Sequence, residues 1–572
     1  MIIQSAQGSQ TTSSPDEARR PFKIMMNAGQ IFLRRPIWLL ALLASVAVLG
    51  LNVWFSLHAG GFWRDEINLI NLSGYHSLAE MEKDSFPLLM PLLIHGWLGA
   101  GLGETSLRWL GLLIGLGLPA ALWFSTWKIN RLPPLLGLAL FGLNSTLIVF
   151  GDSLRAYGLG CLFIVLATWA GASFLAKPSG RRAGWLAAFC VLSVQTLYHN
   201  AILVGAICLG VGLVCVRRKD WSAGVRALAA GALAAVSLLP YFPNLITGRE
   251  ASATLRTGLS WSRLMEGFAD CFGFPLAQYT WIWGVLALLL AWQGWQAFRE
   301  NQRAPAADAN TSAGNDLVLF AAVTFILSFA GFLVFLWLAA FPSQSWYLLP
   351  LMAVAAACLD IAWPRWQKPL RVAMLGLAAG TVLIAVPTAS RDLDYRYTNV
   401  DVWAQQMKSE AVPGDYVIVV PWFCGITFEY YFKNPVAWDT LPPISDHSTH
   451  RFDLAKNQLQ NTNAIVPLIQ RIDTSLQSGH RVWILAQKGW MDVPEPGTTA
   501  AASLPPAPFG RWGWSEVPYT MVWVSQVAHH VGDHSTQFGR VKNPTVGRRI
   551  AEDTELFLAS GWQETTNAVP GR

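Results

Sequence analysis

Long uncharged apolar runs, separated by short polar connections, dominate the first 390 residues of the chain. A run of about 17–25 such residues is long enough to cross the hydrocarbon of a bilayer as a helix. The uncharged stretch 183–216 is too long for one crossing, so we divide it at Tyr198-His199-Asn200. The pattern predicts helices near 37–57, 109–127, 132–150, 156–176, 184–198, 200–216, 227–247, 280–298, 317–341, 345–363 and 372–389.

The apolar segment 85–103 differs from these runs because it contains Pro87, Pro91 and His95. If it does not cross, the basic connections all fall on one side of the membrane, as the positive-inside rule requires. They are Arg34/Arg35, Lys128/Arg131, Arg181/Arg182, Arg217/Arg218, Arg299/Arg303 and Arg365/Arg371. We therefore expect an interfacial or re-entrant segment, about eleven spans, a cytoplasmic tail 1–36 and a membrane domain 37–389. The connections 58–108, 151–155 and 243–279 then lie outside, together with residues 390–572.

The composition agrees with a polytopic membrane protein whose fold is mostly α. Hydrophobic residues make up 53% of the 572 residues and charged residues 13%, against about 25% charged in soluble domains. These values exclude a soluble, disordered or nucleic-acid-binding chain. The net charge of +6 (41 Lys and Arg less 35 Asp and Glu) suits membrane orientation. Among the seven cysteines, Cys271 and Cys424 lie outside the apolar runs, and the sequence leaves open whether they pair.

Residues 390–572 have a different pattern, which predicts an extracytoplasmic α/β domain. Helices are expected at 400–411, 423–432 and 462–478, and buried strands at 415–420 and 481–486. No glycine-rich phosphate motif occurs, so a nucleotide site has no support. Residues 493–513 are rich in Pro, Gly and Ala and are interpreted as a loop, and 514–572 give no clear element.

The most conspicuous polar motif follows the first predicted helix, as Arg64-Asp65-Glu66. Acidic residues favour the first turn of a helix, so a purely structural reading is available. The functional reading is a carboxylate at the membrane surface that acts as a general base. Because adjacent residues point apart, at most one of the two is the base.

Other candidates lie in further connections on the same side. The short connection after the third run contains Asp152, Arg155 and Tyr157. Either Asp152 and Arg155 form a local ion pair beside an interfacial tyrosine, or Arg155 and Tyr157 donate hydrogen bonds to a phosphate. Tyr347, in Trp346-Tyr347-Leu348-Leu349-Pro350, either lies at the membrane interface or donates a hydrogen bond to a bound phosphate. Lys83 is either a solvated charge or a contact to a lipid phosphate. His95 and His199 are either structural residues or substrate-binding residues.

Together these motifs resemble a known family. The order of the motifs is similar to that in the GT-C glycosyltransferases. It runs from the first helix and an outer Asp65-Glu66 pair, through a stretch with Pro87 and Pro91, to Leu107-Arg108, the group at 152–157 and the segment 346–350. Within the GT-C glycosyltransferases the resemblance is to protein O-mannosyltransferases and aminoarabinose–lipid A transferases, and it covers residues 37 to about 365. Two departures are Phe86-Pro87-Leu88 in place of a His-Pro-Pro-Leu segment, and Trp346 where an arginine is usual.

The resemblance implies an inverting glycosyltransferase that uses a polyprenyl-phosphate sugar on the outer face of a bacterial inner membrane. Asp65 would be the catalytic base, supported by Glu66. The phosphate and substrate candidates are Arg155, Tyr157, Asp152, Lys83, Tyr347, Arg64, His199 and His95. The connection 243–279, with Trp261, Phe268, Phe272 and Tyr279, would either close over the site or form an amphipathic helix at the membrane interface. No ligand cluster requires a metal, and a divalent cation at Asp65 and Glu66 is left open.

Two other classes remain as alternatives. The first is a lipid or glycan transporter or flippase. The spans carry almost no ionisable residues, which disfavours this class because transport pathways usually contain such groups. The second is an assembly protein with an outer interaction domain. For the transferase, the partners are the lipid-linked donor, a glycan, lipid or protein acceptor and the membrane lipids, with no nucleic acid.

Overall fold

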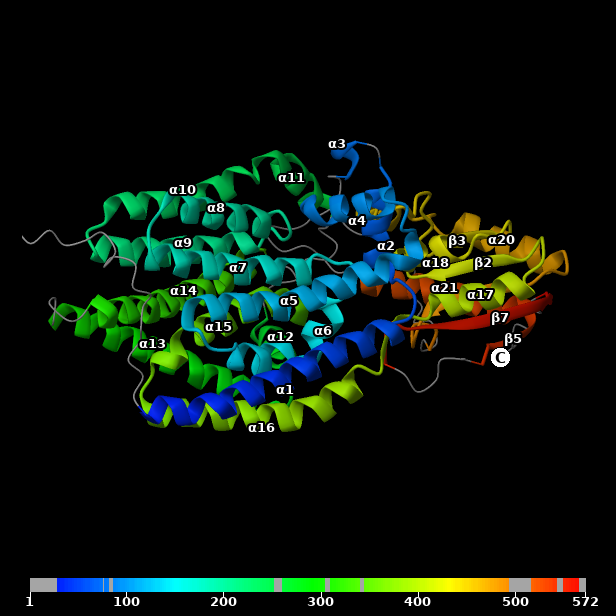
Figure 1. Ribbon diagram of the computed structural model, residues 1–572. Helices are drawn as coiled ribbons and strands as arrows, with labels where there is room; N and C mark the ends of the chain where they lie inside the picture. The colour runs from blue at the N-terminus through cyan, green and yellow to red at the C-terminus, as the bar shows by residue number, and fades with distance from the viewer. Residues whose placement is uncertain are drawn as a thin grey trace, which may run out of the picture.

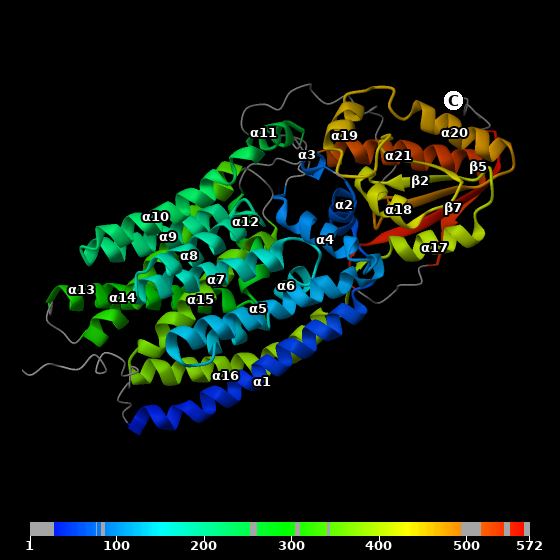
Figure 2. The same cartoon turned by 45° about the horizontal axis from the view of Figure 1, so that its top comes forward.

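The computed structural model describes residues 28–75, 77–81, 86–251, 260–303, 309–339, 344–492, 516–542 and 549–564. Long helices lie side by side and form one elongated bundle, and a smaller region with β-strands packs at one end of it (Figures 1 and 2). The protein is therefore a mostly α, polytopic membrane protein with a C-terminal α/β region. The candidate Lys83 and the expected loop 493–513 lie outside the described residues.

Eight helical segments among the described residues are long and apolar enough to cross a membrane by length and composition. They match eight of the eleven predicted runs. The helices that form them are α1 (Ala28–His58), α5 (Leu107–Asn130), α7 (Tyr157–Ala176), α9 (Asn200–Arg217), α10 (Trp221–Val236), α14 (Ala309–Ala339), α15 (Leu349–Ala362) and α16 (Lys368–Asp392).

The other three predicted runs are also helical but differ from a simple crossing. The run 132–150 contains a π-helical segment (Gly137–Gly142) and α6 (Ser145–Gly151), divided at Asn144. Asn144 accepts a hydrogen bond from the Leu147 backbone N–H at 3.2 Å and donates one to the Cys271 carbonyl at 2.8 Å. The other two runs became α8 (Gly180–Val194) and α13 (Tyr279–Arg303).

The first long connection contains α2 (Arg64–Ser73), α3 (Leu78–Met81) and α4 (Leu89–Gly99). The 11 residues of α4 rise about 16 Å, too little to cross roughly 30 Å of hydrocarbon. The segment 85–103 is thus no span by length, as the sequence predicted. Instead His95 on α4 makes a hydrogen bond through Nδ1 with the Ser73 carbonyl of α2, at 2.7 Å.

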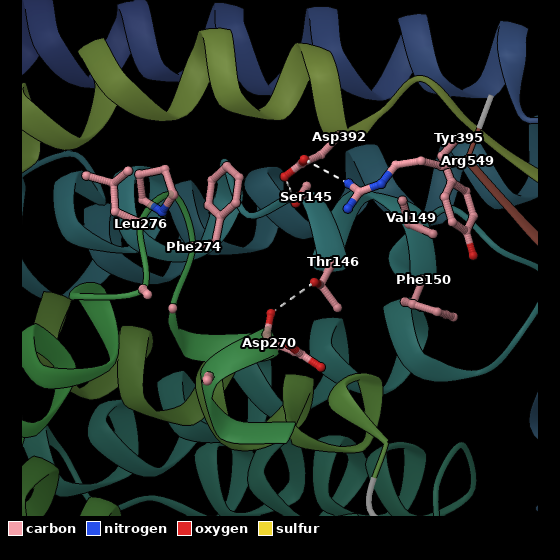
Figure 3. A pocket seen from close by; sticks show the side chains of 14 residues that line it. Ser145, Thr146, Val149, Phe150, Asp270, Phe274, Leu276, Asp392, Tyr395 and Arg549 are labelled. Carbon is pink, nitrogen blue, oxygen red and sulfur yellow. Dashed lines mark hydrogen bonds and ion pairs between the residues drawn. The ribbon is translucent and has the colours of Figure 1, made fainter. Parts of the chain in front are cut away.

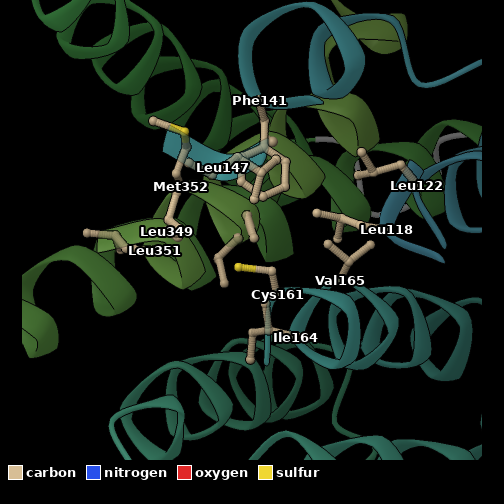
Figure 4. Close-up of a cluster of buried hydrophobic side chains, with 14 of the residues drawn as sticks. Leu118, Leu122, Phe141, Leu147, Cys161, Ile164, Val165, Leu349, Leu351 and Met352 are labelled. Carbon is tan, nitrogen blue, oxygen red and sulfur yellow. The ribbon is translucent and has the colours of Figure 1, made fainter. Parts of the chain in front are cut away.

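A tightly packed interior holds the bundle together. Side chains of α5, α7 and α15 interdigitate at its centre, as Figure 4 shows for Leu118, Leu122, Cys161, Ile164 and Met352. Every residue of α15 is buried, and its run of small side chains lets neighbouring helices approach closely. All seven cysteines are free thiols, so Cys271 and Cys424 do not form a pair.

The C-terminal region is built on a five-stranded sheet with the order β3-β2-β4-β7-β5. Strand β2 runs parallel to β3 and β4, and β7 runs antiparallel to β4 and β5. The strands are β2 (Tyr416–Val420), β3 (Ala437–Thr440), β4 (Val482–Gln487), β5 (Ser535–Arg540) and β7 (Thr554–Trp562). A separate parallel pair, β1 (Tyr395–Thr398) and β6 (Arg549–Glu552), lies where α16 ends.

Both faces of this sheet are covered, which explains why the predicted strands are apolar throughout. Tyr416 and Ile418 of β2 pack toward α20 (Val466–Gln477) and α21 (Val517–His534). Val417 and Val419 pack toward α17 (Val400–Glu410) and α18 (Gly425–Tyr431). The predicted strands and helices between 400 and 486 are confirmed. The elements that were not predicted are α19 (Phe452–Leu459), α21, β1, β3 and β5 to β7.

Candidate functional site

The first turn of α2 places two carboxylates at the junction between the bundle and the C-terminal region. Trp63 precedes the helix, and the Glu66 side chain accepts the Trp63 backbone N–H at 3.4 Å, which caps this end. Asp65 and Glu66 are adjacent on a helix, so their side chains leave it in different directions.

Asp65 lies among three nitrogen groups and keeps 20% of its side chain exposed. Its Oδ1 is 3.6 Å from Arg64 Nε and 3.3 Å from His450 Nε2, and its Oδ2 is 3.6 Å from Arg155 Nη2. Arg155 also donates from Nη1 to the Asp65 backbone carbonyl at 3.1 Å. The cluster joins the first turn of α2, the 152–156 connection and the C-terminal region.

These neighbours control the ionisation of Asp65. Burial by itself raises the pKa of this carboxyl. The charge of Arg155, the hydrogen bond from His450 and the charge of Arg64 lower the pKa by more than burial raises it. The pKa of Asp65 therefore lies well below the usual aspartate range. Asp65 is therefore a carboxylate throughout the physiological pH range.

Glu66 has a structural environment instead. It is fully buried, and its Oε1 accepts hydrogen bonds from Arg108 Nη1 at 2.7 Å and from the Leu154 backbone N–H at 2.9 Å. Arg108 also donates to the Gly61 carbonyl at 2.9 Å and lies 4.3 Å over the Phe62 ring. Glu66 thus fixes α2 to α5 and to the 152–156 connection, and its contacts do not include Asp65.

The predicted phosphate candidates Arg155, Tyr157 and Tyr347 come together behind Asp65. The Arg155 side chain is 7% exposed, and its guanidinium lies 4.1 Å over Phe86 and 6.0 Å from the Tyr157 ring. The Tyr157 and Tyr347 rings are 6.1 Å apart. This arrangement places one buried guanidinium next to two tyrosines.

His199 closes the far side of this group. Its ring is 6.5 Å from that of Tyr347, and its buried Nε2 has no hydrogen-bond partner among the described residues. Burial lowers the pKa of His199 to about 4, so the ring is neutral and can donate or accept one hydrogen bond.

The remaining candidates lie elsewhere. Asp152 packs against α5 at Gly115 and accepts a hydrogen bond from Ser56 Oγ at 3.4 Å. Arg155 pairs with Asp65 and not with Asp152, so the local ion pair considered from the sequence is not formed. His95 joins α4 to α2, as described above.

The connection expected to close over the site packs into the bundle through one face of its second helix, and the other face of that helix is exposed. It contains α11 (Phe242–Ala251) and α12 (Trp261–Phe272), and residues 252–259 lie outside the described residues. Phe268 and Phe272 of α12 pack against Phe329 and Trp283. Only Trp261, 71% exposed, is free of such packing among the four aromatic residues named for this role.

Two residues of the C-terminal region, His450 and Glu552, join the site and were missed by the sequence. The His450 backbone N–H donates to Asn68 Oδ1 of α2 at 2.9 Å, and the ring stacks on Phe452. Glu552 of β6 lies 3.8 Å from Arg64 and accepts a hydrogen bond from Thr427 at 2.9 Å. The polar composition of 445–451 was the only sequence signal near either residue.

The donor set does not fit a divalent cation. Cationic or N–H groups occupy both oxygens of Asp65, and Arg108 occupies Glu66. The described residues contain no group of three His, Cys, Asp or Glu side chains arranged to hold a metal ion. The arginines and tyrosines around Asp65 suit an anionic ligand instead.

Comparison with known proteins gives structural likenesses and no match in sequence. No family model matches the sequence, and no curated protein matches it. Among solved structures, the chain is similar to apo ArnT from Cupriavidus metallidurans, with a TM-score of 0.45 and 13% sequence identity. The alignment covers 81% of this chain and 94% of that chain. A likeness at this level assigns no activity.

Proposed function

We propose that the protein is an integral membrane glycosyltransferase that moves a sugar from a polyprenyl-phosphate donor to an acceptor hydroxyl on the outer face of the membrane. One observation carries the proposal. An ionised carboxylate, Asp65, lies between Arg64 and Arg155 where the apolar bundle meets the C-terminal region. The motif resemblance described above points to the same chemistry.

The charges around Asp65 suit both halves of such a reaction. The acceptor hydroxyl needs a base, and the departing prenyl phosphate needs cationic donors where its negative charge grows. Arg155 supplies a nearly buried guanidinium that can bind phosphate oxygens with two N–H groups. Tyr157 and Tyr347 add hydroxyl donors beside it.

Donor binding would also strengthen the base. Arg155 and Asp65 are 3.6 Å apart, longer than a close charged hydrogen bond of about 2.8 Å. A phosphate in contact with Arg155 draws that cation toward itself. Asp65 then loses its strongest stabilising charge, so its pKa rises and its carboxylate becomes a better proton acceptor.

The transfer itself needs three coupled changes. Asp65 takes the proton of the acceptor hydroxyl, and the acceptor oxygen forms a bond with the anomeric carbon of the sugar. The bond from that carbon to the phosphate oxygen breaks, and its electron pair stays on the prenyl phosphate. Attack opposite the leaving group inverts the configuration at the anomeric carbon.

The charged residues of the described spans disfavour the transporter alternative. Asp316 of α14 pairs with Arg217 and Arg218 of α9. Asp360 of α15 accepts the backbone N–H groups of Leu136 and Gly137, each at 3.0 Å. These acids are engaged in structural contacts, whereas a transport path requires accessible ionisable groups.

A donor assay tests the proposal. Purified protein is incubated with radiolabelled polyprenyl-phosphate sugars and membrane extract, and the release of prenyl phosphate is measured. Asp65→Asn should lower turnover about 10²–10⁴-fold, the usual contribution of a general base. Asp533→Asn, an equally conservative change at an exposed position of α21, should leave turnover unchanged.

Arg155 supplies a second arm of the same assay. Arg155→Ala should abolish transfer, and Arg155→Lys should recover only part of it, because lysine keeps the charge and loses the planar pair of donors. Near-normal turnover in folded Asp65→Asn or Arg155→Ala protein would show that the assigned role is wrong.

A further inference from the structure

A pocket of about 320 Å³ lies beside the Asp65 cluster, where the bundle meets the C-terminal region. It is bordered by α6, the end of α12 with the connection to α13, the end of α16, and β6 (Figure 3). Its volume is at the lower end of the range of small-molecule sites, about 300–1,000 Å³, which suits a single sugar ring.

The polar part of the pocket is acidic. Arg549 Nη1 lies 3.0 Å from Asp392 Oδ1, and Ser145 Oγ donates to Asp392 Oδ2 at 3.1 Å. Asp270 also lines the pocket, and its backbone carbonyl accepts a hydrogen bond from Thr146 Oγ1 at 3.5 Å (Figure 3). Two carboxylates and one arginine give the lining a net charge of −1, and the arginine is already paired. A phosphate is therefore disfavoured, and a ligand rich in hydroxyl donors is favoured.

The pocket also has an apolar part, at the end away from Arg549. Figure 3 shows Phe274 and Leu276 at one end of the pocket and Tyr395 and Arg549 at the other. Leu276 is 45% exposed, so this end is open to an alkyl chain. An amphipathic pocket of this kind fits a lipid whose headgroup is an uncharged glycoside.

Several side chains lie between this pocket and the proposed catalytic cluster. Phe150 lines the pocket, and its ring is 6.5 Å from that of Tyr157. Tyr157 in turn lies 6.0 Å from the Arg155 guanidinium, which pairs with Asp65. The pocket is therefore a separate site from the Asp65 cluster.

We propose that this pocket binds the glycoside headgroup of a membrane lipid. This binding does not rest on the proposed function, because Asp65 does not line the pocket. The carboxylates of Asp270 and Asp392 accept hydrogen bonds from sugar hydroxyls, Phe274 covers a face of the ring, and the alkyl chain leaves past Leu276.

Photo-crosslinking tests the binding. The protein, in phospholipid nanodiscs free of glycoside detergent, is titrated with an alkyl glucoside that carries a diazirine near its headgroup. Crosslinked peptides should map to 145–150 and 269–277. Asp270→Asn should weaken half-saturation about tenfold or more, as loss of a hydrogen bond to a charged group does. Glu266→Gln, one turn earlier on α12, exposed and outside the lining, should match wild type.

Competitors identify the ligand class. Unlabelled alkyl glucoside should displace the probe, whereas alkyl phosphate and methyl glucoside at equal concentration should not. Displacement by alkyl phosphate would overturn the uncharged headgroup, and equal displacement by methyl glucoside would overturn the lipid. Labelling elsewhere, or labelling unchanged by Asp270→Asn, would overturn the pocket itself.

The same probe separates this inference from the proposed function. Asp65→Asn should keep wild-type labelling, since Asp65 does not line the pocket. Labelling that depends on Asp270, without sugar transfer from any donor, would leave the binding site standing and overturn the proposed function. Sugar transfer without labelling would leave the proposed function standing and overturn the binding site.

Discussion

Asp65 and Glu66 leave the first turn of α2 in different directions and meet different partners. Glu66 is fully buried against Arg108 and the Leu154 backbone. Asp65 keeps partial exposure and touches two arginines and one histidine, all at 3.3–3.6 Å. Glu66 is thus a structural acid and Asp65 a candidate base, and the difference in solvent exposure of the two side chains distinguishes the roles.

His450 should act as a positioning residue for Asp65. Removal of its hydrogen bond raises the pKa of Asp65, since that bond helps to lower it. The base works as the carboxylate, so activity is lost as pH falls through this pKa. We expect His450→Ala to shift the acid limb of the kcat/KM profile to higher pH and to lower kcat about tenfold.

The pH profile distinguishes this role from a general loss of structure. His529→Ala, on α21 outside the site, should leave both the acid limb and kcat unchanged. A uniform loss of activity in His450→Ala, with no movement of the acid limb, would contradict the assignment.

At the scale of elements, α2 contacts both the bundle and the C-terminal region. Glu66 and Arg108 attach it to α5, while Asn71 donates to the Ser448 carbonyl at 2.8 Å and Asn68 binds the His450 backbone. Because α2 also begins with Arg64 and Asp65, its position sets the geometry of the candidate site.

The Glu66–Arg108 pair should be costly to break. Arg108→Ala leaves the buried Glu66 carboxylate without its cation, which destabilises proteins by about 3–5 kcal/mol. We expect a clear fall in the thermal unfolding midpoint of the detergent-solubilised protein, and partial recovery in the Arg108→Ala/Glu66→Gln double variant. Lys408→Ala, on the helix α17, is the control, and no recovery in the double variant would contradict the explanation.

Glu552 makes the attachment of β6 sensitive to pH. Burial raises the pKa of this carboxyl from 4.5 to about 7, although Arg64 opposes the shift. The folded protein therefore holds a proton that the unfolded chain releases above about pH 4.5. Stability is fully present below that value and falls as pH rises to 7, by an amount on the order of 3 kcal/mol.

Thermal unfolding between pH 5 and 8 tests this expectation. The wild-type midpoint should fall as pH rises, and Glu552→Gln should remove much of the slope because its amide does not titrate. Glu410→Gln, exposed at the end of α17, should keep the wild-type slope. Identical slopes in all three proteins would show that Glu552 is not the titrating group.

For the molecule as a whole, the proposed orientation follows from the basic connections. The C-terminal region and the Asp65 site are expected on the outer side, and the connection with Arg181 and Arg182 on the cytoplasmic side. All seven native cysteines are buried, so an added cysteine can be labelled selectively.

Labelling of single added cysteines measures this orientation. In intact cells, an impermeant maleimide should modify Asp533→Cys directly and Arg181→Cys only after permeabilisation. Both positions are exposed. The opposite order would invert the topology and place the candidate site in the cytoplasm.

Local sequence pattern was sufficient for much of the fold. An apolar run of about 20 residues is stable in a bilayer only as a helix that satisfies its own backbone, so each predicted run is helical. The same reasoning found β2 and β4, because a strand buried on both faces is apolar throughout. The sequence also singled out Asp65, Arg155, Tyr157 and Tyr347 as candidates, and the structure brings these four residues together.

Tertiary structure decided what local pattern does not contain. The break in the third run depends on Asn144 and its bond to Cys271, and the separate fates of Asp65 and Glu66 depend on which surfaces cover α2. His450 and Glu552 reach the site from a distant part of the chain. Periodicity reports which face of an element is buried, but only the folded chain determines which distant side chain meets that face.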